Sequence, residues 1–158
     1  MPRIFKCRSG AADVTAAYGV DDPVGTGCPN HRPDVLLVQH LLRVAWNDAP
    51  ISKGFRPPGE TQPLTVDGVW GPRSAKFLKF FQEEAVRRGV RVMTDGRVDP
   101  CVSGKYRGSI SNTLYTAMAL NAARNSRLPG SQADIAQDPG FPAELEPYFY
   151  VTANQYKG

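Results

Sequence analysis

The stretch Leu64–Gln82, "LTVDGVWGPRSAKFLKFFQ", contains a turn that is followed at once by an amphipathic helix. Asp67-Gly68 is a strong turn signal, because Asp hydrogen-bonds the backbone that follows it and Gly tolerates a positive φ. Gly71-Pro72 then begins a helix, since Pro at the first helical position loses no N–H that the helix needs. These signals predict a helix over Pro72–Arg88 that stops near Gly89.

One face of this predicted helix is apolar and the other is charged. The inward face has the helical spacing i, i+3, i+4 and i+7, at Ser74, Phe77, Leu78 and Phe81. The solvent-facing side carries the cations Lys76, Lys79, Arg87 and Arg88. An amphipathic helix of this kind is expected to bury one side against other helices.

Two further helices are predicted from the same periodicity. The first covers Val35–Trp46, with Asp34 as its N-cap and an inward stripe of Val35, Val38, Leu41, Leu42 and Ala45. The last covers Ser111–Asn125, with Ser109 or Ser111 as its cap and an inward stripe of Leu114, Ala117, Met118 and Ala122. We therefore expect an all-α bundle of three short helices, in which long loops make up a third or more of the chain.

The two ends of the chain differ from this pattern. Arg3–Lys6 ("RIFK") and Tyr148–Val151 ("YFYV") are rich in aromatic and β-branched residues, which favours a short two-stranded ribbon formed by the termini. The expected organisation is an N-terminal extension over residues 1–33, a helical domain over residues 34–127, and a tail over residues 128–158 that packs on the domain.

Charge and hydropathy exclude some classes of partner. Lys and Arg number 19 against 15 Asp and Glu, which gives a net charge of +4 that is too small and too scattered to indicate nucleic-acid binding. No segment is apolar and long enough to span a membrane. The N-terminus lacks the pattern of a signal peptide, so we expect a cytoplasmic protein or one exported to the periplasm or cell wall by a non-classical route.

Three cysteines, Cys7, Cys28 and Cys101, leave an odd thiol under any pairing. They are typical of ordinary thiols in a reducing cytoplasm, whereas a Cys7–Cys28 bridge is the alternative for a protein that ends up outside. Cys28 with His31 resembles half of a zinc site, but no second pair completes the four ligands of structural zinc. We therefore expect neither a metal nor a cofactor.

Together these segments resemble the small three-helix peptidoglycan-binding domains found beside many cell-wall hydrolases. That family reads apolar-Gln-x-x-Leu, then Asp-Gly-x-x-Gly-Pro-x-Thr, then Ala-Val-x-x-Phe-Gln. The corresponding residues are Val38-Gln39 with Leu42, then Asp67-Gly68, Gly71-Pro72 and Ser74, then Phe77-Leu78 and Phe81-Gln82. A second turn at Asp95-Gly96 resembles the one before the third helix, with an insertion ahead of Thr113-Leu114. The resemblance covers roughly Asp34–Arg127.

The resemblance implies a non-catalytic module that binds peptidoglycan or a muropeptide near the two Asp-Gly corners. The candidate ligand-binding residues are Asp67, Gly68, Trp70, Arg73, Asp95, Arg97 and Tyr115. Turn chemistry alone also explains Asp67 and Gly68, and Trp70 suits a core position as well as it suits stacking on a sugar. Gln39 and Gln82 are interpreted as buried amides that satisfy loop backbone groups, with no ligand role.

Two other functions stay open at this stage. One is a protein–protein adaptor, carrier or inhibitor built on the same fold, with a secretion-apparatus or effector protein as partner. Val24–Val35 resembles the segment before the first helix in family members of bacterial and phage secretion or lysis proteins. The other is a small cell-wall hydrolase, which we do not expect: His31 and His40 form no zinc motif, and the adjacent Glu83-Glu84 cannot flank one glycosidic bond.

Overall fold

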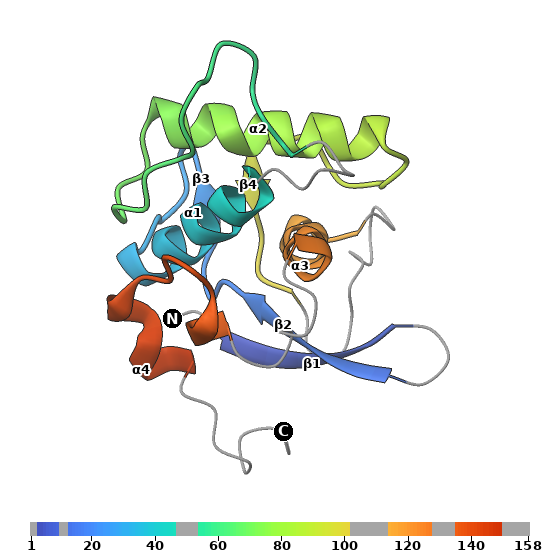
Figure 1. Cartoon of the computed structure of the whole chain (residues 1–158), viewed down its shortest axis with the longest axis vertical. Coiled ribbons are helices and arrows are strands. Elements are labelled where there is room, and N and C mark those ends of the chain that lie inside the picture. Colours follow the sequence, from blue (N-terminus) through green and yellow to red (C-terminus); the bar gives the residue numbers. More distant parts are fainter. Residues whose placement is uncertain (1–2, 10–12, 47–53, 102–113, 128–134, 150–158) are drawn as a thin grey trace.

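The computed structural model of the chain describes residues 3–9, 13–46, 54–101, 114–127 and 135–149. Over these residues the fold is small and mostly helical, with four α-helices and two short two-stranded sheets (Figure 1). The helices are α1 (Arg32–Trp46), α2 (Pro72–Arg87), α3 (Thr116–Arg127) and α4 (Glu146–Phe149), and two single 3-10 turns, Ile135–Gln137 and Ala143–Leu145, precede α4. None of the described helices is both long enough and apolar enough to cross a bilayer.

The helix α2 follows the sequence prediction closely. Gly71 is its N-cap, Pro72 occupies the first turn, and the helix ends at Arg87, with Gly89 at a φ of +90° just beyond it. Glycine adopts a positive φ without strain, and a residue with positive φ ends a right-handed helix, so Gly89 lets the chain leave α2 here. The four predicted inward residues, Ser74, Phe77, Leu78 and Phe81, are all buried.

The helix α1 begins at Arg32, three residues before the predicted start at Val35. Asp34 lies in the first turn, is fully buried, and accepts the backbone N–H groups of Asp21 at 3.0 Å and Asp22 at 3.3 Å. The prediction of Asp34 as N-cap was therefore wrong, because its carboxylate accepts hydrogen bonds from the backbone of the segment that precedes the helix. Burial raises the pKa of Asp34 above its usual value.

The helix α3 begins at Thr116 rather than at Ser111, and the two candidate caps, Ser109 and Ser111, lie outside the described residues. Leu114 is not helical: its N–H donates to the carbonyl of Arg91 at 2.8 Å, within a bridge to Val92. Ala117 and Met118 are buried as predicted, but Ala122 is exposed. The inward face instead includes the buried polar residues Asn121 and Arg124, which a search for apolar periodicity passes over.

The predicted ribbon between the two ends of the chain was wrong. β1 (Arg3–Ser9) pairs antiparallel with β2 (Asp13–Gly19) in a local hairpin, while Tyr148 lies in α4 and residues 150–151 fall outside the described part. Pairing neighbours in sequence closes a much shorter loop than pairing the termini would, so it loses less chain entropy. α4 does contact β1, so these two described segments meet as a helix against a strand.

A second small sheet joins the N-terminal segment to the region after α2. β3 (Val24–Gly25) pairs antiparallel with β4 (Arg97–Val98). The two backbones approach so closely that a Cβ on Gly25 would lie 2.5 Å from the carbonyl oxygen of Gly96. Only glycine fits at this position. The side chain of Asn30 accepts the Gly25 N–H through Oδ1 and donates to the Gly25 carbonyl through Nδ2, each at 2.8 Å.

The core draws on residues from α1 to α4, from both 3-10 turns and from β2, β3 and β4. α1 packs against both α2 and α3, and α3 lies between α2 and the β1–β2 ribbon (Figure 1). Aromatic pairs connect these elements: Trp46 with Phe77 at 5.8 Å, Phe55 with Phe81 at 4.5 Å, and Tyr18 with Phe149 at 5.3 Å between ring centroids. The helices are therefore held in fixed positions relative to the two Asp-Gly turns.

Candidate functional site

The first corner, Asp67–Val69, is held by one buried glutamine from α1. Gln39 is fully buried, and its Oε1 accepts the N–H of Asp67 at 3.0 Å and that of Gly68 at 2.8 Å. Its Nε2 lies 3.1 Å from Asp67 Oδ1, 3.0 Å from the carbonyl of Val69 and 3.1 Å from Ser74 Oγ. One amide thus connects α1, the turn and the first turn of α2.

The second corner, Asp95–Arg97, is held in the same way by a glutamine from α2. The Oε1 of the fully buried Gln82 accepts the N–H of Gly96 at 2.8 Å. Its Nε2 lies 3.3 Å from Asp95 Oδ1, 2.9 Å from the carbonyl of Arg97 and 3.1 Å from Thr116 Oγ1. Thr116 begins α3, as Ser74 lies in the first turn of α2.

The two corners are therefore copies of one unit, which we call the glutamine clamp: a buried helical glutamine, an Asp-Gly turn and a hydroxyl in the next helix. The clamps support the interpretation of Gln39 and Gln82 as buried amides that satisfy loop backbone groups. Ser74 belongs to the first clamp and Gln82 to the second, and their separation of eight positions places the clamps about 12 Å apart along α2. The sequence indicated this repeat through its two Asp-Gly turns but not through the two hydroxyls.

The third helix carries a charged variant of this arrangement, which the sequence analysis missed. Arg124 follows Thr116 by eight residues, as Gln82 follows Ser74. Its Nε and Nη2 donate to Asp138 at 2.6 Å and 2.7 Å, and both side chains are fully buried. An Asp-Pro-Gly sequence after Arg124 was the signal that could have indicated this contact.

His40 completes the buried ionic cluster around Asp138. Its Nε2 lies 2.9 Å from Asp138 Oδ2, while the edge of its ring faces Phe141 at 5.2 Å between centroids. Burial by itself raises the pKa of Asp138, but hydrogen bonds from Arg124 and His40 outweigh it and leave that pKa below its usual value. His40 is therefore a structural residue that joins α1 to the C-terminal segment.

The remaining candidates for metal or redox chemistry are dispersed. His31 is exposed and lies 3.2 Å from Asp22, and Cys28 is a free thiol. Within the described ranges, no three His, Cys, Asp or Glu side chains come together as metal ligands would. The side chain of Cys7 lies outside the described part of the chain.

At the first corner, Asp67 is exposed and Gly68 is buried. The N–H of Val69 donates to Asp67 Oδ1 at 3.0 Å, and this hydrogen bond holds the pKa of the Asp67 carboxyl below its usual value. Gly68 has a φ of +78°, and a Cβ there would lie 2.6 Å from Nη1 of Arg32, which itself donates to the carbonyl of Asp67. Gly68 is thus needed for the turn, while the second carboxylate oxygen of Asp67 stays available.

Trp70 and Arg73 lie next to this corner but are largely engaged within the protein. Trp70 is half-buried and packs against the core. Arg73 donates to Glu60 and to the carbonyls of Gln62 and Pro63, so its guanidinium ties the preceding loop to α2. Both residues are therefore less available to a ligand than the sequence alone suggested.

At the second corner, Asp95 and Arg97 are exposed. Asp95 uses Oδ1 for the clamp and for the N–H of Arg97 at 3.1 Å, and Arg97 contacts Asp99 at 3.0 Å through Nη2. Tyr115 is half-buried beside Met118 and Ala17 in a small separate apolar cluster. The structure brings Asp95 and Arg97 together, whereas no described contact joins Tyr115 to either of them.

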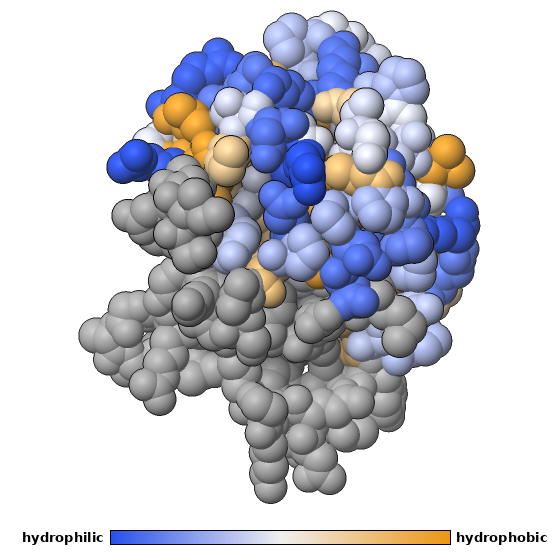
Figure 2. Space-filling model, turned by 180° about the vertical axis from the view of Figure 1, so that it is seen from behind, coloured by the Kyte–Doolittle hydropathy of each residue, from blue (hydrophilic) through white to orange (hydrophobic). Residues whose placement is uncertain are grey.

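The surface around the described helices is suited to polar ligands. Figure 2 shows that the coloured, described part of the face behind the view of Figure 1 is mainly hydrophilic, with apolar residues in small separate groups. Val69, at the first corner, is the most exposed of the large apolar residues described, at 63%. Over the described residues of that face, the apolar groups are too dispersed to form a large docking patch.

Comparisons with protein-family models, with curated proteins and with solved structures give no match.

Proposed function

We propose that this chain is a non-catalytic module that binds peptidoglycan through its two Asp-Gly corners. The observation that carries the proposal is the matched pair of glutamine clamps, Gln39 at the first corner and Gln82 at the second. Each clamp fixes a turn of the motif on which the resemblance to peptidoglycan-binding domains rests. A turn held by buried hydrogen bonds is already ordered, so a ligand that binds it loses little additional entropy.

The groups left free at the corners match the chemistry of the cell wall. Among the described residues, the hydrogen bonds of Asp67 and Asp95 are made through Oδ1, so Oδ2 can accept hydrogen bonds from glycan hydroxyls. Arg97 keeps N–H donors beyond the one that meets Asp99, and these suit a stem-peptide carboxylate. The corners thus offer both acceptors and a cation at the surface.

The test is co-sedimentation of the purified protein with isolated bacterial sacculi. Arg97→Ala removes the cation at the second corner and should lower the sedimented fraction severalfold. Arg87→Ala removes another exposed arginine, on α2 and away from the corners, and should leave the sedimented fraction unchanged. Arg73→Ala is a weaker probe, because losing its contacts with the loop would disturb the fold. Trp70→Ala, checked to be folded, tests whether the indole contributes.

Two outcomes would assign a different function. If the parent protein does not sediment with sacculi but captures one protein partner tightly, the chain is an adaptor on the same fold. If it releases soluble muropeptides from sacculi, it is a hydrolase and the non-catalytic part of the proposal is wrong.

A further inference from the structure

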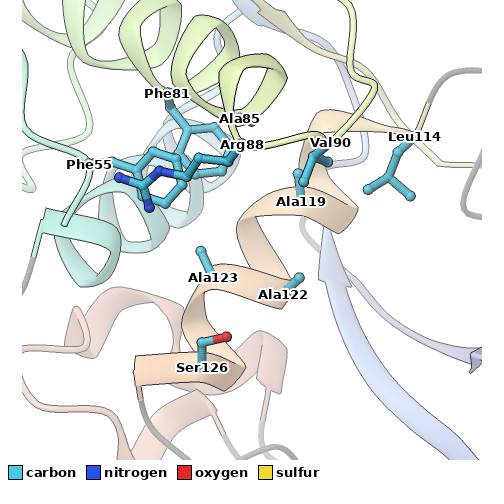
Figure 3. A pocket seen from close by; sticks show the side chains of 10 residues that line it. All are labelled: Phe55, Phe81, Ala85, Arg88, Val90, Leu114, Ala119, Ala122, Ala123 and Ser126. Carbon is cyan, nitrogen blue, oxygen red and sulfur yellow. The ribbon is translucent and has the colours of Figure 1, made fainter. Parts of the chain in front are cut away.

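A hollow of about 300 Å³ lies between the C-terminal half of α2 and α3 (Figure 3). It is lined almost entirely by carbon: Phe55 and Phe81 on one side, Ala119 and Ala123 on another, and Val90 and Leu114 at the end. It lies away from both Asp-Gly corners, and neither clamp glutamine lines it. Its volume is at the small end of the range for sites that bind small molecules.

The hollow exists because α3 presents only short side chains here. Ala119, Ala122, Ala123 and Ser126 line it, so ligand atoms could approach the backbone of the helix. The opposite wall is rigid, since Phe81 is buried and its ring lies 4.5 Å from that of Phe55 between centroids. Protein cores normally leave few spaces larger than a water molecule, so this open volume is a preformed site.

Arg88 supplies a cation at the rim. Its guanidinium carbon lies 4.0 Å from the centroid of the Phe55 ring, and its side chain extends across that ring in Figure 3. Nε donates to Glu84 at 3.2 Å and Nη2 to the carbonyl of Gly54 at 3.3 Å. The other three guanidinium N–H groups have no acceptor among the described residues. Glu84 also contacts Arg87 at 3.2 Å, so the carboxylate of Glu84 is shared between two arginines, of which Arg88 alone lines the hollow.

We infer that this hollow binds a small amphiphilic carboxylate, whose aromatic or branched apolar body lies between Phe81 and Ala123 and whose carboxylate meets the free N–H groups of Arg88. The carbon lining is unsuited to a sugar, because buried hydroxyls would lose their hydrogen bonds to water without new partners. The ligand class therefore differs from the glycan and peptide proposed for the corners, and the two sites are independent.

The experiment is a titration of the ¹⁵N-labelled full chain with 3-phenylpropionate, with its neutral amide 3-phenylpropanamide as the paired probe. Saturable shifts are expected at the backbone amides of Val90, Ala119, Ala123 and Ser126. Arg88→Gln should weaken binding of the carboxylate about tenfold, because a charge-assisted hydrogen bond is lost. Arg87→Gln is the matched control: it contacts the same Glu84, does not line the hollow, and should bind like the parent. Ala123→Leu should fill the space and abolish binding.

Five results would overturn all or part of the inference. The carboxylate part is wrong if the neutral amide binds as tightly as the carboxylate or if Arg88→Gln binds like the parent. The site is wrong if the shifts map to other residues. It is also wrong if the shifts persist in Ala123→Leu after thermal unfolding has shown that this variant is folded. The inference fails altogether if no saturable shift occurs at about 10 mM, well above the dissociation constant expected for a ligand of this size.

Discussion

Replacing Gln39 by Leu removes the first clamp while keeping a side chain of similar size. Two of the groups left without a partner are buried, the N–H of Gly68 and the hydroxyl of Ser74. An unsatisfied buried polar group costs about 1–3 kcal/mol. The N–H of Asp67 and the carbonyl of Val69 are nearer the surface and can turn to water, so we expect a total loss of about 2–5 kcal/mol in the free energy of unfolding.

The assay is urea unfolding followed by tryptophan fluorescence, in which Trp70 reports on the corner and Trp46 on the core. Gln62→Leu is the matched control, because Gln62 is exposed and its side chain has no role in the clamp, and it should change stability by no more than about 0.5 kcal/mol. A double-mutant cycle with Ser74→Ala isolates the contact between the two side chains and should give a coupling of about 0.5–3 kcal/mol.

The reasoning fails if Gln39→Leu loses less than about 1 kcal/mol, since the two buried groups would then have found other partners. It also fails if the cycle with Ser74→Ala shows no coupling, because the amide and the hydroxyl would then act independently.

Phe81→Ala should lower the free energy of unfolding by about 3–5 kcal/mol, measured by the same urea titration, because Phe81 is buried against Phe55 and the hollow would widen; a loss below about 1 kcal/mol would place the ring outside the shared core. Asp138→Asn should lose about 3–5 kcal/mol by leaving Arg124 buried without its carboxylate; parent-like stability would contradict the ion pair. Because the folded pKa of Asp138 lies below its usual value, its stabilisation is fully present above pH of about 3.9 and disappears as pH falls through the folded pKa. The difference in unfolding free energy between the parent and Asp138→Asn should therefore shrink as pH falls below that value. A constant difference down to about pH 2 would show that folding does not lower the pKa of Asp138.

The sequence predicted the parts of the fold that depend on neighbouring residues. The start of α2 follows from Gly71-Pro72, and its inward face from the spacing of Ser74, Phe77 and Phe81, because these signals act within one or two helical turns. The burial of both clamp glutamines was also predicted, since an amide beside an Asp-Gly turn has backbone groups to satisfy.

The parts that failed depend on contacts between distant residues. Asp34 lies within the first turn of α1 and accepts hydrogen bonds from the backbone N–H groups of Asp21 and Asp22, so it does not cap the helix. The position of Asp34 in the sequence does not reveal these contacts. The pairing of β1 with β2 and the pairing of Leu114 with Val92, which precedes α3, each depend on which segments meet in the folded protein. The charged cluster of Arg124 with Asp138 and His40 was missed because buried charges interrupt apolar periodicity. The hollow is invisible in the sequence, since it is a space among side chains from three segments.

The most direct test of the proposed function is an amide chemical-shift map of the ¹⁵N-labelled chain titrated with soluble muropeptides. Our account predicts saturable shifts at Gly68 and Val69 in the first corner and at Gly96 and Arg97 in the second, with the amides of α4 unmoved. A titration that shifts neither corner, while the same muropeptides bind a known wall-binding protein in parallel, would contradict it.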